Sequence, residues 1–145
     1  MARDITSDFN TAIKSTVVQP IFAIELEFSD GTLRFWNGYG SITMTAGGSS
    51  KVFTGTGDLL SISPVEESST LQMNGISVAL TGIKSSLVST ALSAQYTNRD
   101  AALYMGLYNA SGSVIADVYT LFKGKMDVLN ITEQADTATI TLNIE

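Results

Sequence analysis

Short stretches in which apolar and polar residues alternate, separated by turn residues at roughly ten-residue spacing, constrain this chain most. The clearest stretch places Ile24, Leu26 and Phe28 on one face of an extended segment. Ser29–Gly31 then supplies a turn, and Thr32–Asn37 returns as the partner strand. Because side chains of a strand point alternately to its two faces, this period predicts a β-hairpin with one buried face.

Further strands follow along the chain, bounded by glycine, asparagine or aspartate. The same pattern predicts them over Ser41–Thr45, Lys51–Thr54, Leu59–Ser63, Leu71–Met73, Ile76–Leu80, Ala101–Tyr108, Tyr119–Thr132 and Thr137–Glu145. Many short strands joined by polar turns are typical of antiparallel sandwiches and barrels. The fold class expected here is therefore mainly β, a single-domain antiparallel β-barrel or sandwich with one or two short helices.

Two short segments show helical spacing instead. Ser7 is a good N-cap for a helix over Asp8–Lys14, and an apolar stripe predicts a second helix over Ser85–Ser93. The strand pattern is interrupted at Pro20, so residues 1–19 are expected to form an N-terminal arm that packs on a neighbouring protein. Residues 20–145 are expected to form the β-barrel or sandwich, with the helix over Ser85–Ser93 packed against it.

The residue types that carry most enzyme chemistry are missing from this sequence. It contains no histidine and no cysteine, which excludes Ser-His-Asp catalysis, thiol catalysis, disulfides and thiolate metal sites. Glu66 and Glu67 are adjacent, so on a strand they point to opposite faces and cannot converge on one bond or metal. The segment Gly55–Asp58 lacks the third glycine or the lysine of a phosphate-binding loop. We therefore expect no enzyme, no catalytic residues, no cofactor and no metal.

Charge and hydropathy argue against two further classes of function. Eight Lys and Arg against 14 Asp and Glu give a net charge of −6, which argues against specific binding of nucleic acid. The first residues show no signal-peptide pattern, and the longest apolar run, Ile21–Ile24, is far too short to cross a bilayer. The expected protein is made in a cytoplasm and has no membrane partner.

Two predicted strands are apolar on both faces. In Ala101–Tyr108, leucine and methionine side chains take one face, whereas Tyr104 and Tyr108 take the other. In Tyr119–Thr132, the apolar residues change parity near Asp127. Within one chain, a covering helix or a bulge near Asp127 accounts for such strands. Alternatively, their outward aromatic residues meet another subunit, which makes Tyr104 and Tyr108 candidate interface residues.

Three stretches together match the pattern of a known family. They are Thr32–Gly40 (TLRFWNGYG), Thr54–Glu67 (TGTGDLLSISPVEE) and Phe122–Asp127 (FKGKMD). With them, the chain resembles a β-rich domain of tail-tip, or baseplate, hub-type proteins of tailed bacteriophages and related phage-like elements. The resemblance covers nearly the whole chain from about Ile21, and its motifs are structural. Some relatives carry cysteine-ligated clusters, which are not carried over because this chain has no cysteine.

The resemblance implies a structural component of the virion tail, near the hub or the tail-tube adaptor. Its expected partners are other tail proteins (hub, distal tail adaptor, tail tube) and further copies of itself in a cyclic, head-to-tail ring. The candidate interface residues are Trp36, Tyr39, Tyr104 and Tyr108. A carbohydrate-binding module for cell-surface attachment is the alternative, resting on Trp36, Tyr39 and Tyr96. A hydrolase with two carboxylates is a third hypothesis with little in the sequence to support it.

Overall fold

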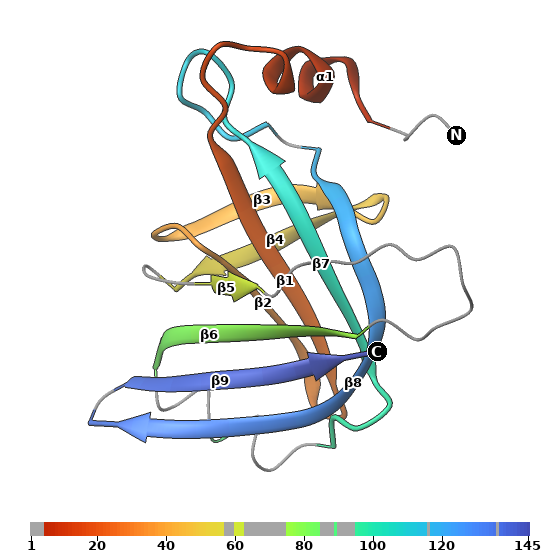
Figure 1. Cartoon of the computed structure of the whole chain (residues 1–145), viewed down its shortest axis with the longest axis vertical. Helices are drawn as coiled ribbons and strands as arrows, with labels where there is room; N and C mark the ends of the chain where they lie inside the picture. The colour runs from red at the N-terminus through yellow and green to blue at the C-terminus, as the bar shows by residue number, and fades with distance from the viewer. Residues whose placement is uncertain are drawn as a thin grey trace.

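The computed structural model describes residues 5–56, 60–62, 75–84, 89, 95–115, 117–135 and 137–145. Its elements, shown in Figure 1, are the helix α1 (Ser7–Ile13) and the strands β1 (Pro20–Phe28), β2 (Gly31–Trp36), β3 (Ser41–Ala46), β4 (Ser49–Gly55), β5 (Leu60–Ile62), β6 (Ile76–Lys84), β7 (Asp100–Leu107), β8 (Tyr119–Gln134) and β9 (Thr137–Ile144). The predicted mainly β fold class with a short helix is confirmed.

The strands form one open sheet in the order β3-β4-β2-β1-β7-β8-β9-β6-β5. The architecture is therefore a sandwich and not a closed barrel. Every neighbouring pair is antiparallel except β2 and β4, which pair in parallel at Phe35↔Thr54 and Trp36↔Gly55. This parallel pair arises because β3 lies between β2 and β4 in the chain, so β4 runs in the direction of β2. The predicted all-antiparallel pairing is wrong at this one contact.

β8 joins the two parts of the sheet, since its first half pairs with β7 and its second half with β9. Met126 of β8 lies opposite Ile144, whereas Leu129 lies opposite Leu142, so β8 uses one residue more than β9 over this stretch. The predicted bulge near Asp127 is thereby confirmed. A bulge bends its strand and adds twist, and accordingly β6 and β9 run across the direction of β1 and β7 (Figure 1).

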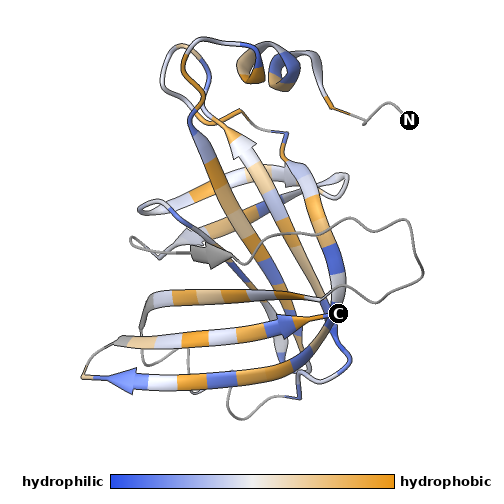
Figure 2. Cartoon of the chain, in the orientation of Figure 1, coloured by the Kyte–Doolittle hydropathy of each residue, from blue (hydrophilic) through white to orange (hydrophobic). Residues whose placement is uncertain are grey.

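The main core lies between these two layers. Its most buried members are Ile24, Leu26, Val78, Leu80, Leu103, Met126, Leu142 and Ile144. They occupy alternate positions along their strands, and Figure 2 shows the matching bands of apolar and polar residues along β8 and β9. Burying each such side chain stabilises the fold by about 1.5–3 kcal/mol, which makes this cluster the main source of stability.

A second cluster lies on the opposite faces of β1 and β7, under the hairpin of β3 and β4. It contains Ile21, Ala23, Trp36, Met44, Ala46, Phe53, Ala102 and Tyr104. The carbonyl oxygen of Thr45 accepts a hydrogen bond from the N–H of Val118 at 3.1 Å, and Thr45 also forms an isolated parallel bridge with Asp117. The hairpin thus folds back as far as the segment before β8. β1 and β7 are therefore buried on both faces within one chain, and the β3–β4 hairpin covers their second face.

The N-terminal arm packs on its own chain. Thr6, and not the predicted Ser7, is the N-cap of α1, and its Oγ1 accepts from the N–H of Phe9 at 3.4 Å. Phe9 is 3% exposed and packs with Leu107 and Ile115. Phe9 therefore attaches the arm to its own chain, and packing of the arm on a neighbouring protein stays a prediction. Pro20 begins β1, where its missing N–H costs no ladder hydrogen bond.

The sequence predicts one further helix after α1. The helix predicted over Ser85–Ser93 lies outside the described residues, apart from Ser89, which is helical and exposed. In the part of the chain that the structure describes, no helix is both long and apolar enough to span a membrane.

Candidate functional site

The loop Asn37–Gly40, between β2 and β3, is held on both sides by hydrogen bonds to other elements. The carbonyl oxygen of Gly40 accepts from the Trp36 indole Nε1 at 2.9 Å and from the N–H of Gly55 at 2.7 Å. At the other end of the loop, the side chain and N–H of Asn37 bond to the backbone of Phe22, at 3.0 and 3.1 Å. The loop backbone is therefore fixed by β1, β2 and β4 together.

The glycines of this region are required by close approach. A Cβ on Gly38 would lie 2.0 Å from carbons of the Trp36 ring, and one on Gly55 would lie 2.3 Å from the carbonyl oxygen of Gly38. Gly40 has φ +72°, a conformation that glycine adopts without strain. Two stretches of the motif pattern, Thr32–Gly40 and the start of Thr54–Glu67, thus meet in space and depend on each other's glycines.

Tyr39 lies at the tip of this fixed loop and is 77% exposed. An exposed tyrosine on a fixed loop backbone offers a partner contact area at little cost in conformational entropy. The loop is therefore a candidate contact site, with Tyr39 as its candidate anchor.

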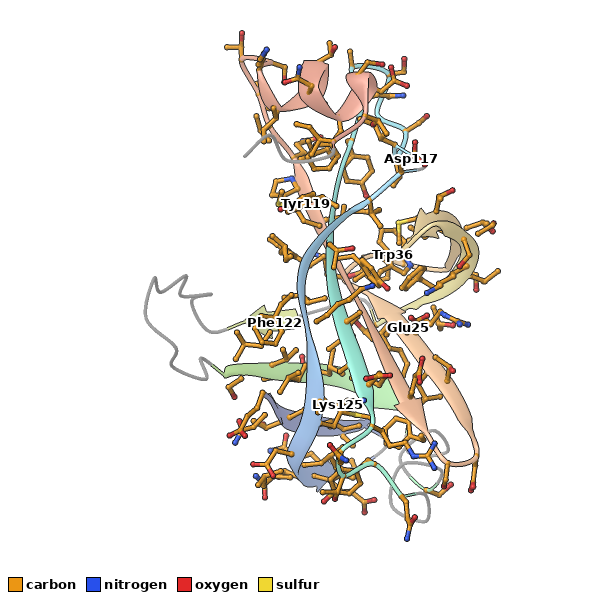
Figure 3. The ribbon with its side chains drawn as sticks, turned by 90° about the vertical axis from the view of Figure 1, so that its right-hand side faces the viewer. Glu25, Trp36, Asp117, Tyr119, Phe122 and Lys125 are labelled. Carbon is orange, nitrogen blue, oxygen red and sulfur yellow. The ribbon has the colours of Figure 1, made fainter. Side chains whose placement is uncertain are left out.

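Trp36 is buried, with 6% of its surface exposed. It shapes the loop from inside, through its ring packed on Gly38 and its indole N–H bonded to Gly40. Figure 3 shows Trp36 and Glu25 on the side of the molecule that carries the β3–β4 hairpin, with Phe122 on the other side. The sequence grouped Trp36 and Tyr39 as equivalent interface candidates, whereas the structure gives them different positions.

The prediction that the Tyr104 ring faces outward is wrong. Tyr104 is 1% exposed, and its ring packs edge-on against Phe53, with the centroids 6.1 Å apart. Tyr108 is half-buried at the margin of the same cluster and lines a groove of about 820 Å³ together with Val17 of the arm. Tyr96 is half-buried against the main core. Of Tyr96, Tyr104 and Tyr108, Tyr108 alone is both a predicted interface residue and partly accessible to solvent.

An ion cluster around Glu25 is the feature that sequence reasoning missed. Glu25 is 7% exposed; one carboxylate oxygen accepts from Arg34 Nε at 2.5 Å and the other from Lys51 Nζ at 2.8 Å. Burial raises the pKa of Glu25, but hydrogen bonds and charges from Lys51 and Arg34 outweigh it and leave the pKa below its usual value. Burial lowers the pKa of Lys51, but Glu25 and Tyr104 together outweigh burial and leave this pKa above its usual value.

Part of this cluster follows from local register. Glu25 lies directly opposite Arg34 in the predicted hairpin, so that pair follows from the turn position. Lys51 comes from β4, and its approach depends on the fold-back of the β3–β4 hairpin, for which the sequence has no local signal. Among the described residues, no three His, Cys, Asp or Glu side chains are placed to hold a metal ion.

No model of a known protein family matches this sequence, and no curated protein matches it. The resemblance to phage tail-tip proteins therefore depends on the quoted motifs alone. Function is inferred from those motifs, the fold and the exposed surface.

Proposed function

We propose that this protein is a structural component of a phage or phage-like tail tip or baseplate, which assembles as a ring with other tail proteins near the hub or tail-tube adaptor. The observation that carries the proposal is the fixed loop Asn37–Gly40 with Tyr39 77% exposed at its tip. Buried residues fix the loop that carries this exposed aromatic ring, and such a ring on a fixed loop is suited to binding another macromolecule.

The motif stretches support the proposal through the roles of their residues. Trp36, Gly38, Gly40 and Gly55 build one loop from two separate parts of the chain. If the chain is a structural tail protein, as the resemblance implies, its motif residues are expected to shape a contact loop. The virion tail is accordingly the proposed location, and the hub, the distal tail adaptor and the tail tube are the proposed partners.

Exposed aliphatic residues on the N-terminal arm give a second support. Ile13 is 44% exposed, Val17 71% and Val18 42%, although Phe9 of the same arm is buried. A partner that covered these side chains would gain about 25 cal/mol for each Å² of apolar surface removed from water. The arm thus offers a second contact surface, separate from Tyr39, as a subunit with neighbours on two sides needs.

The carbohydrate-binding alternative needs several exposed rings at one site. Trp36 is buried and Tyr96 is half-buried against the main core, so of its three rings only Tyr39 is well exposed. Sugar binding is therefore kept as an outcome of the experiment and not as a second proposal.

The test compares Tyr39→Ala with the wild-type chain, alone and mixed with the products of adjacent genes. Light scattering after gel filtration and negative-stain microscopy report ring formation, and thermal unfolding reports stability. Loss of an anchor residue costs about 2 kcal/mol or more of binding, so Tyr39→Ala should weaken assembly at least tenfold with the unfolding temperature unchanged. Val128→Ala, 45% exposed on the other layer, is the matched control and should leave assembly within about twofold.

A wild-type chain that stays monomeric in every mixture, and does not enter tails, would contradict the proposal. A screen of surface glycans distinguishes the alternative, because saturable glycan binding that Tyr39→Ala abolishes would assign the loop to carbohydrate.

A further inference from the structure

A cleft of about 450 Å³ runs along the face of β1, β7 and β8 beside the turn of the β3–β4 hairpin. Its lining residues are Glu25, Glu27, Gly47, Lys51, Asp100, Ala101, Ala102, Tyr104, Lys123, Gly124 and Lys125. The register places Glu25 beside Ala102 and Ala102 beside Lys123, so the small side chain of Ala102 forms the floor between two charged walls. The next row, two residues along, contains Glu27, Asp100 and Lys125.

Two ammonium groups and one phenol oxygen lie around the end of this cleft next to Gly47. The position that a Cβ on Gly47 would take lies 3.6 Å from Tyr104 Oη, 3.8 Å from Lys51 Nζ and 3.9 Å from Lys123 Nζ. These donors come from β7, β4 and β8, so only the folded chain brings them together. Gly47 has φ +61° in a two-residue glycine turn and has no side chain to fill the space between them.

The charges at this end do not balance. Glu25 is shared between Arg34 and Lys51, so these three residues together have a charge of +1. Lys123 adds another positive charge, and no described carboxylate pairs with it. At the other end, Lys125 is paired with Asp100 at 2.5 Å, and Glu27 adds a negative charge. Three of the eight basic residues of an acidic chain therefore line one cleft, and a fourth, Arg34, is paired with Glu25 of its lining; the excess positive charge lies next to Gly47.

We propose that the end of this cleft next to Gly47 binds an anionic oxygen group, a carboxylate or a phosphate, between Lys51 Nζ and Lys123 Nζ. Such a group accepts charge-assisted hydrogen bonds from both ammonium groups, and it offsets the repulsion between the two lysines. Both oxygens of Glu25 are already engaged: one accepts from Arg34, and the other accepts from Lys51 Nζ at 2.8 Å and from the Tyr104 hydroxyl at 3.4 Å. Glu25 therefore positions Lys51 and does not occupy the site. This site goes beyond the proposed tail function and does not depend on it.

The two sources of such a group are a free anion and the acidic side chains of a protein partner. They are distinguished by titrating the full chain with sodium phosphate and, separately, with a triglutamate peptide, against sodium chloride at the same ionic strength. Amide chemical shifts of Gly47, Lys51 and Lys123 report occupancy. Saturable shifts confined to these residues support the site, and the tighter of the two ligands identifies the source.

Lys123→Gln removes one ammonium group from an exposed position, so the fold should be retained. Loss of one charge-assisted hydrogen bond should weaken binding about tenfold. Lys125→Gln, two residues along the same strand and already paired with Asp100, is the control and should change the affinity by less than about twofold. Shifts that do not saturate with either ligand, or equal weakening by the two variants, would overturn the site.

Discussion

The indole Nε1 of Trp36 donates a hydrogen bond to the carbonyl oxygen of Gly40 at 2.9 Å, across the loop that carries Tyr39. The same carbonyl oxygen accepts from Gly55 of β4, so a single acceptor joins the loop to two strands. Tyr39 is therefore held at the surface by groups that are themselves buried or half-buried. The consequences for stability and assembly can be tested residue by residue.

Trp36→Phe keeps a large ring and removes the indole N–H. Loss of one hydrogen bond should lower the free energy of unfolding by about 1 kcal/mol, since a typical net value is about 0.5–1.5 kcal/mol. The Gly55 amide, which donates to the same oxygen, should exchange with solvent faster. Hydrogen exchange measured by NMR checks this, with the amide of Ile24 in the main core as the internal control. Unchanged exchange at Gly55 would show that the indole bond does not hold the loop.

Gly38→Ala places a methyl group into the Trp36 ring. Overpacking of this kind costs about 1–3 kcal/mol. The three atoms nearest to a Cβ on Gly38 all belong to the Trp36 ring, so the cost should fall sharply in a Trp36→Ala background. A double-mutant cycle on the free energy of unfolding measures the coupling. Additive effects of the two substitutions would mean that the glycine is required for another reason.

Glu25→Gln should be costly at neutral pH, because it leaves Arg34 and Lys51 without their carboxylate. Removing one partner of a largely buried ion pair costs about 3 kcal/mol. The pKa of Glu25 is lowered by folding, so its ionised form stabilises the protein above the unfolded value of about 4.3. That stabilisation is lost as the pH falls from this value through the lower pKa of the folded state.

The free energy of unfolding of the variant should accordingly depend less on pH than that of the wild type in the acid range. Urea denaturation at a series of pH values measures the difference. Glu27→Gln, two residues along the same strand and exposed, is the matched control and should keep the wild-type acid dependence. A variant with the same pH dependence as the wild type would show that the pair does not link protonation to folding.

Local features of this fold could be predicted from the sequence. The β1–β2 hairpin follows from the alternation of Ile24, Leu26 and Phe28 before a turn, and the bulge near Asp127 follows from a change of parity. Both depend on residues close in the chain, where period and turn chemistry are sufficient.

Features that depend on tertiary packing could not be predicted. Tyr104 has the alternation expected of a second, outward face, and only the fold-back of the β3–β4 hairpin makes that face a core. The same fold-back brings Lys51 to Glu25, although 26 residues separate them. Of the candidate interface residues, Tyr39 is exposed, whereas Trp36 is buried beneath its loop and Tyr104 is buried against Phe53.

Tyr104→Ala should now be as destabilising as a core substitution. Truncating a buried aromatic ring costs about 3–5 kcal/mol, similar to or greater than the 2–5 kcal/mol expected for Leu103→Ala on the other face of β7. Tyr104→Phe removes only the hydroxyl and should cost about 1 kcal/mol. Equilibrium denaturation of the three variants checks this order. A Tyr104→Ala protein of wild-type stability would restore the outward-facing assignment.

The N-terminal arm gives the last prediction, because its buried and exposed residues should separate folding from assembly. From the sequence, removing residues up to Lys14 is expected to spare folding. The structure predicts instead that the arm contributes to folding, because Phe9 is 3% exposed and packs against Leu107 and Ile115. Phe9→Ala should therefore lower the free energy of unfolding by about 3 kcal/mol. Val17 is 71% exposed, so Val17→Ser should change the free energy of unfolding by no more than about 0.5 kcal/mol while weakening ring formation. Denaturation curves and light scattering on both variants test this, and a Val17→Ser protein that assembles like the wild type would exclude that side chain from the contact surface.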